Sequence, residues 1–290
     1  MKRESIFLVV LLAVFGFSTA NAQINFNEKA LGAVQKAFAG VTFSDAEAAQ
    51  LSKAAVDKMD TEHVIAGPTD PYAIRLNKIF GKYTTAFGVT LNYKVYILKE
   101  VNAFATADGS VRVYSGLMDV MDDNELLVVI GHEIGHVVNH DSRDAVKAAY
   151  QKEALIDGVA SQYDKVAAVT DSQLGKIGSA MIDSKHSRKQ ESEADDFAYE
   201  FMKKNGYDVN AVESAFSILA KMSEGTQSDF LTKMMSSHPD SKERAANAKM
   251  KAEKDGLYKP YVHKMPVVAK PKATTTKKTT TKKTTTTKKK

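Results

Sequence analysis

The feature that most constrains this chain is the segment GHEIGH, residues 131–136, which lies inside a long apolar run. On a helical wheel of residues 124–140, leucine, isoleucine and valine side chains form one apolar stripe, and a second apolar side carries the histidines. A helix that is apolar on two sides is buried. We therefore predict a buried helix that holds two histidines and a glutamate, and this combination needs a chemical reason.

The reason that the spacing indicates is a metal ion. Four residues of helix rise about 6 Å, so His132 and His136 lie on one face and can bind the same ion. Glu133 is turned by about 100° from His132, which places its carboxylate beside that ion. This is the H-E-x-x-H pattern of zinc metalloproteases, in which the glutamate acts as general base.

Two glycines in the same helix support this interpretation. Gly131 and Gly135 each cost about 1 kcal/mol relative to alanine inside a helix. They lie four residues apart on one face, where missing side chains let another backbone approach closely. The sequence therefore predicts a second segment packed tightly against the histidine helix.

A catalytic zinc needs a third protein ligand, and the residue pattern leaves several candidates. The four candidates are His140, Glu153, Glu191 and His238. His140 continues the row of histidines, but it lies about 12 Å of helix rise from His132, so we expect it to support the site or to lie at the helix C-terminus rather than bind the ion. If the chain turns back as a helix after residue 142, Glu153 would lie about 8 Å beyond the position that faces His136.

Two candidates come from later in the chain. Glu191, in ESEADD, has Asp195 four residues on, so one helix face could offer one carboxylate to the ion and a second to a histidine ring nitrogen. Glu153 has a similar partner in Asp157, so both remain open on spacing alone. We expect His238 to lie near the active site without being a permanent ligand.

The periodicity predicts a mostly helical α+β fold with a small antiparallel sheet before the histidine helix. Alternating residues from Leu91 to Leu98 predict a strand, and Asp108-Gly109 between two β-like segments predicts a hairpin over 101–114. A helix is expected from about Pro71 to a point before Gly81 or Gly88. Helical patterns cover the other segments: 26–40, 44–59, 115–121, 124–140, 142–156, 172–184, 187–204, 210–223 and 240–254.

The two ends of the chain have different compositions from the middle. Residues 1–22 have the basic start, apolar core and Ala-x-Ala exit of a secretory signal peptide, which predicts cleavage after Ala22 and export to the periplasm, envelope or medium. Residues 264–290, which we call the Lys/Thr tail, cannot bury enough apolar surface to fold. Residues 23–70 are expected to form an N-terminal helical segment and 71–263 the main domain. The chain has no cysteine, which excludes disulfides and thiolate chemistry.

The basic net charge belongs to the tail. The Lys/Thr tail holds ten lysines and no acids, so subtracting ten from the formal +5 leaves −5 for residues 1–263. This balance argues against a nucleic-acid-binding domain. A lysine-rich tail can bind an anionic envelope polymer or a membrane surface, or serve only for solubility.

Several motifs in order resemble one family. GHEIGHVVNH, SRKQESEADDFA, HPDSKER and the segment VNAFATADGSVRVYSGLM (residues 101–118) are together similar to the HtpX-like zinc metallopeptidases, which include the CAAX prenyl proteases and the mitochondrial Oma-type proteases. The resemblance covers about residues 70–255. It implies a zincin-like metalloprotease domain of the gluzincin type with one zinc ion per chain.

The resemblance also assigns site residues. It implies that Glu191 is the third zinc ligand, that Asp195 supports a histidine ligand, and that His238 and Arg244 lie at the active site, where they stabilise the oxyanion or occupy the metal. Some relatives span the membrane between the two metal-binding helices. Residues 142–186 here carry too many charges for that, so no transmembrane segment is expected in the mature chain.

These observations predict an exported zinc endopeptidase for polypeptide substrates, with Glu133 as general base. We expect an extended substrate to add a strand to the sheet edge at Asn102, Ala103, Phe104 and Ala105, because backbone pairing accepts many sequences. That mode suits unfolded or misfolded envelope proteins. The alternative is a catalytically idle, zinc-stabilised scaffold or chaperone anchored by the Lys/Thr tail.

Overall fold

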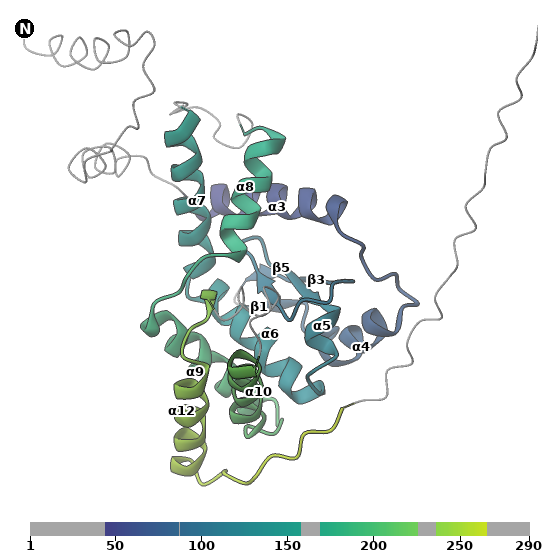
Figure 1. The fold of residues 1–290 in the computed structure, drawn as a ribbon, viewed down its shortest axis with the longest axis vertical. Coiled ribbons are helices and arrows are strands. Elements are labelled where there is room, and N and C mark those ends of the chain that lie inside the picture. Colours follow the sequence, from purple (N-terminus) through teal and green to yellow (C-terminus); the bar gives the residue numbers. More distant parts are fainter. Residues whose placement is uncertain (1–43, 87, 158–168, 226–235, 266–290) are drawn as a thin grey trace, which may run out of the picture. The chain divides into compact units, whose positions relative to one another are not determined.

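The computed structural model describes residues 44–86, 88–157, 169–225 and 236–265 (Figure 1). The predicted signal peptide, the helix expected over 26–40 and residues 266–290 of the Lys/Thr tail lie outside the described residues. No helix within the described ranges has both the length and the apolar character needed to cross a bilayer.

The described residues form a mostly helical α+β fold, which confirms the predicted class. The helices are α3 (Asp45–Glu62), α4 (Pro71–Phe80), α5 (Ser115–Met118), α6 (Asp123–Val138), α7 (Asp141–Asp157), α8 (Asp171–Ile182), α9 (Arg188–Lys204), α10 (Ala211–Gly225) and α12 (Ser241–Lys254). The strands are β1 (Thr85–Ala86), β2 (Val89–Thr90), β3 (Asn92–Tyr96), β4 (Ala103–Ala105) and β5 (Ser110–Tyr114).

The main sheet has the strand order β3-β5-β4. The predicted hairpin is confirmed: β4 pairs antiparallel with β5, and Gly109 at the turn has a φ of 85°, which favours glycine. Strand β3 pairs parallel with β5, so the sheet is mixed. The chain between β3 and β4 crosses from one edge of the sheet to the other. Strand β5 therefore lies in the centre, between β3 and β4.

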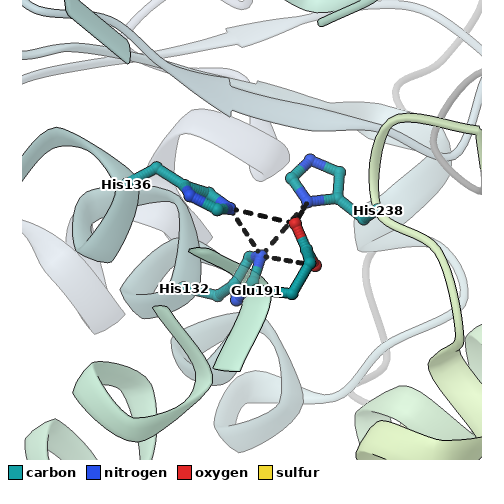
Figure 2. A group of neighbouring side chains, drawn as sticks. All are labelled: His132, His136, Glu191 and His238. Atoms are coloured by element: carbon teal, nitrogen blue, oxygen red, sulfur yellow. Dashed lines mark hydrogen bonds and ion pairs between the residues drawn. The ribbon is translucent and has the colours of Figure 1, made fainter. Parts of the chain in front are cut away.

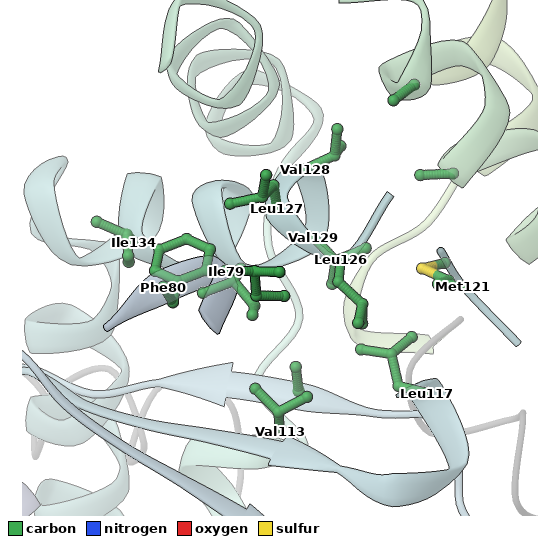
Figure 3. Close-up of a cluster of buried hydrophobic side chains, with 14 of the residues drawn as sticks. Ile79, Phe80, Val113, Leu117, Met121, Leu126, Leu127, Val128, Val129 and Ile134 are labelled. Carbon is green, nitrogen blue, oxygen red and sulfur yellow. The ribbon is translucent and has the colours of Figure 1, made fainter. Parts of the chain in front are cut away.

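Helix α6 forms the centre of the main core (Figure 3). An Asp122 N-cap with a Glu125 capping box starts the helix, and its apolar residues from Leu126 to Ile130 are buried. They belong to the same cluster as Val113 of β5, Phe80 of α4 and residues of α10. The prediction of a helix buried on two sides is confirmed.

The opposite side of the sheet is covered by a second group of helices. Helices α3, α7 and α8 pack on one another (Figure 1), and a separate cluster joins α3 to Tyr96, Phe104 and Tyr114 of the sheet. A buried ion network links the same layers, because Asp60 of α3 binds Arg112 of β5. The sheet therefore lies between α6 on one face and α3 on the other.

The glycines of α6 allow the close approach predicted for them. A Cβ on Gly135 would lie 3.0 Å from Cα of Ala194, and a Cβ on Gly131 would lie 3.6 Å from Cα of Ala198. Both alanines are on α9, which starts at an N-cap and capping box of Ser187. The glycines thus determine how near α9 comes to the histidine helix.

The chain after α12 returns to the start of α6. Tyr261 donates its hydroxyl to Asp122 at 2.8–2.9 Å, the main-chain N–H of Lys264 donates to Asp122 at 3.1 Å, and Nδ1 of His263 lies 2.7 Å from Oε2 of Glu125. Asp122 and Glu125 form the capping box of α6. We call residues 256–265 the C-terminal clasp.

Candidate metal centre

Four side chains converge between α6, α9 and the segment before α12 (Figure 2). Nε2 of His132 lies 3.1 Å from Nε2 of His136 and 3.2 Å from Nδ1 of His238. Oε1 of Glu191 lies 3.0 Å from Nδ1 of His238 and 3.4 Å from Nε2 of His136. These four residues, which we call the metal cluster, each offer an atom within 4.8 Å of the others, so one ion can contact them all.

A carboxylate holds the outer ring nitrogen of each α6 histidine. Nδ1 of His132 lies 2.8 Å from Oδ1 of Asp195, and Nδ1 of His136 lies 2.8 Å from Oδ2 of Asp141. Gln190 of α9 also donates to Asp141, at 2.8 Å. Such partners fix the ring orientation, so both Nε2 atoms face the same point.

Arg244 of α12 lies behind the metal cluster. Its guanidinium donates to Asp195 at 2.6 and 2.8 Å, and its Nη1 lies 2.7 Å from Oε2 of Glu191. The guanidinium also stacks on the ring of Phe216, 4.1 Å from the centroid. The structure thus brings Arg244 to the site, where its charge balances the two α9 carboxylates.

Burial and neighbouring charges shift the pKa values of these groups. Burial raises the pKa of Glu133, whereas burial and the Arg244 charge lower the pKa of His132 to about 3. Burial opposes the charged form of His136, but hydrogen bonds to Asp141 and Glu191 outweigh it and raise its pKa to about 9. Glu133 is thus the carboxylate of the site whose proton affinity is increased.

The residues fit a divalent ion. Oε1 of Glu133 is buried and accepts no hydrogen bond. A buried carboxylate oxygen without such a partner is costly, and a cation at the cluster would compensate for it. Imidazole and carboxylate donors in a compact group of this kind suit Zn²⁺.

Two earlier candidates do not join the metal cluster. His140 is exposed and has a φ of 66°, because α6 has ended and the chain turns into α7 at this residue. Of the two expectations for His140, the structure therefore agrees with a place at the helix C-terminus, and the neighbouring Asp141 contacts His136 instead. Glu153 is buried elsewhere, 2.9 Å from Nζ of Lys176 on α8.

Sequence reasoning missed Asp141 and His186. The His186 ring stacks on His136 with ring centroids 3.8 Å apart and an interplanar angle of 14°. Its main-chain N–H donates to the carbonyl of Ser237, so it also fastens the segment that carries His238. The only sequence signal for His186 is its position immediately before the N-cap of the helix that bears Glu191.

The predicted substrate strand borders the metal cluster. A cavity of about 30 Å³ lies between β4 and α6, with Ala103, Phe104 and Ala105 on one side and Glu133 and His136 on the other. Asn102 lies just outside it and lines a neighbouring groove. An extended chain placed along β4 would therefore pass Glu133.

Several known proteins have similar sequences. The sequence profile of Peptidase family M48 matches residues 75–252. The chain is 40% identical over 223 residues to metalloprotease LoiP of Escherichia coli (strain K12), which covers 77% of this chain and 87% of that protein. It is 41% identical over 211 residues to metalloprotease YcaL of the same strain, covering 72% of this chain and 81% of that one.

A more distant relative is protease HtpX of Xanthomonas euvesicatoria pv. vesicatoria (strain 85-10), which is 31% identical over 177 residues, 59% of this chain and 53% of that protein. The matched region contains both α6 and α9, which supply the metal cluster's histidine pair and its glutamate. The chain therefore belongs to Peptidase family M48 and is a metalloendopeptidase.

Proposed function

We propose that the chain is an exported zinc endopeptidase in which His132, His136 and Glu191 hold one Zn²⁺ and Glu133 is the general base. The observation that carries the proposal is Glu133 itself. Its carboxylate is buried beside the metal cluster, has an oxygen without a hydrogen bond, and borders the cavity along β4. A structural metal site has no need of such a group.

Zinc, when bound, would polarise the peptide carbonyl and lower the pKa of water toward about 7. Glu133 takes the proton from the attacking water and passes it to the leaving amine. The raised pKa of Glu133 suits both roles, because a base with increased proton affinity accepts the proton more readily and can still return it. Asp195 and Asp141 keep the two imidazoles in place during these transfers.

His238 and Arg244 are proposed to act on the negative charge that develops at the carbonyl oxygen. Nε2 of His238 lies 3.5 Å from Oε1 of Glu133, and its Nδ1 reaches the metal cluster. His238 can therefore either donate to the oxyanion or take the fourth ligand position. Arg244 acts through its contacts with Glu191 and Asp195.

The substrates are proposed to be unfolded or misfolded envelope proteins, bound as an added strand on β4. β4 is an edge strand of the main sheet, which suits this mode because backbone pairing is independent of side chains. The predicted signal peptide supports export. The Lys/Thr tail is proposed to bind an anionic envelope polymer or membrane surface.

The alternative is an idle, zinc-stabilised scaffold anchored by the same tail. The presence of four donors in the metal cluster favours it, since a catalytic zinc keeps one position open. The scaffold predicts bound zinc without turnover.

The replacement Glu133→Gln separates the two functions. If Glu133 is the general base, hydrolysis of casein should fall by about 10²- to 10⁴-fold. Metal analysis should still find one zinc per chain, because Glu133 is not a ligand. The exposed Glu253→Gln on α12 is the matched control and should retain activity. Undiminished cleavage by purified Glu133→Gln protein would remove Glu133 from this role, and a wild type that binds zinc without cleaving would favour the scaffold.

A further inference from the structure

The hydrogen-bond pattern of β4 shows which backbone groups face its free edge. Tyr114 donates its N–H to the carbonyl of Asn102, and Thr106 donates to the carbonyl of Ser110, both at 3.0 Å. In an antiparallel pair these bonded positions alternate with positions that point the other way. Ala103 and Ala105 therefore direct their N–H and C=O groups toward the free edge.

Two side chains already occupy part of that edge. Oδ1 of Asn102 accepts the N–H of Ala103 at 2.9 Å, and the hydroxyl of Ser142 donates to the carbonyl of Ala105 at 3.0 Å. The C=O of Ala103 and the N–H of Ala105 remain for a substrate. These two groups flank Phe104, and we take the substrate strand to run antiparallel to β4, with its bonded residues opposite Ala103 and Ala105.

The register determines which way each substrate side chain points. Phe104 packs with Tyr96 and Tyr114 on the α3 side of the sheet, whereas Ala103 and Ala105 belong to the core around α6. Side chains of an added strand alternate in the same way. The substrate residue opposite Asn102 therefore points toward the α3 side, two residues C-terminal to the residue opposite Phe104.

A groove of about 400 Å³ lies at that place, between α3, α8 and the chain leading into β4. Its lining includes Leu98, Tyr114 and Ile182 and the carboxylates of Glu62, Glu100 and Asp183. Glu62 also pairs with Lys58 of α3, at 2.8 Å. Burial and then the carboxylates of Glu100 and Asp183 raise the pKa of Tyr114 to about 12, so both act on the same part of the groove. Among the described residues that line it there are acids but neither lysine nor arginine.

We propose that this groove is a specificity subsite that takes a lysine or arginine side chain of the substrate residue paired opposite Asn102. The proposal rests on the endopeptidase function proposed above. A long basic side chain fits such a site because its methylene stem covers apolar surface while its charged end stays near carboxylates and water. The site thus selects one basic residue at a fixed distance from the bond that is cut.

The test uses internally quenched peptides in which arginine replaces norleucine at one position at a time, with cleavage sites mapped by mass spectrometry. Wild-type protein should prefer arginine at a single position relative to the cut. The double variant Glu100→Gln/Asp183→Asn should lower kcat/KM for the arginine peptide by about two- to fivefold, because exposed ion pairs contribute little free energy. The loss should lie in KM, and added salt should reduce the wild-type preference.

Cleavage of the norleucine peptide should be unchanged in the double variant, which shows that the protein is folded and catalytically intact. The matched control, Glu213→Gln/Glu253→Gln, removes the same charge from α10 and α12, outside the groove. Glu133-dependent cleavage without a basic preference, or with one that survives the double variant, overturns the subsite alone. Absence of Glu133-dependent cleavage of every peptide overturns the endopeptidase function and the subsite with it.

Discussion

The two faces of the central sheet both bury charged side chains, but these side chains differ in how completely they are hydrogen-bonded. On the α3 face, Asp60 accepts hydrogen bonds from Arg112 at 2.9 and 3.0 Å, and from Lys94 and Tyr96 at 2.6 Å each. On the α6 face, the buried Oε1 of Glu133 accepts no hydrogen bond. A network with all its partners holds layers together, whereas an incomplete one is suited to receive a ligand.

The largest expected effect on stability comes from zinc binding to the metal cluster on the α6 face. Zinc at about 1,000 times its Kd should stabilise wild-type protein by about 4 kcal/mol, because it binds only the folded state. Glu191→Gln should lose most of this gain, since one ligand carboxylate is removed. Thermal unfolding with zinc or with a chelator measures both. Equal zinc-induced shifts in the two proteins would contradict Glu191 as a ligand.

The next largest effect on stability comes from removing the charge of Asp60 on the α3 face. Asp60→Asn should destabilise the fold by about 3 kcal/mol, because it leaves the buried Arg112 without its charge partner. The zinc-induced shift should remain as in wild type, since Asp60 lies on the opposite face of the sheet. Denaturant unfolding measures the loss, and a reduced zinc response would show that the two faces are coupled.

The Asp60 contribution should depend on pH in a defined direction. Burial opposes its charged form, but hydrogen bonds from Arg112, Lys94 and Tyr96 outweigh it and lower its pKa from 3.8 to about 2. A lowered pKa means that the stabilisation is complete above the unfolded value and is lost as pH falls through the folded one. The stability difference between wild type and Asp60→Asn should therefore shrink between pH 4 and pH 2.

The smallest effect tests how closely α9 approaches the site. Gly135→Ala would put a Cβ 3.0 Å from Cα of Ala194, so we expect a loss of about 1–3 kcal/mol and weaker zinc binding as α9 is pushed away. Gly131→Ala meets only ordinary contacts, at 3.5 Å or more, and should be neutral or stabilising by up to about 1 kcal/mol. Zinc titration and thermal unfolding of the pair measure the difference.

Sequence reasoning reached local features of the site best. His132, Glu133 and His136 follow from the repeat of a single helix, and the close approach at Gly135 follows from the same pattern. Glu191 needed the family resemblance, because spacing alone left Glu153 open. The choice between Glu191 and Glu153 depends on how the histidine helix packs against a second helix. A local sequence pattern gives no information about this packing.

The errors occurred where the chain changes direction. Of the two expectations for His140, support of the site and a place at the helix C-terminus, the structure agrees with the second, because α6 ends at Val138 and His140 adopts a left-handed conformation. Asp141 takes the position beneath His136 as a result. The parallel pairing of β3 was missed for a similar reason, since alternation identifies a strand but not its neighbour.

The C-terminal clasp has a mechanical consequence. Tyr261, His263 and Lys264 attach the end of the described chain to Asp122 and Glu125, the residues that begin the histidine helix. Tension applied to the residues that follow would therefore reach the foot of the catalytic helix first. If the enzyme is anchored by its C-terminus, the pull therefore acts on α6, the helix that carries His132, Glu133 and His136.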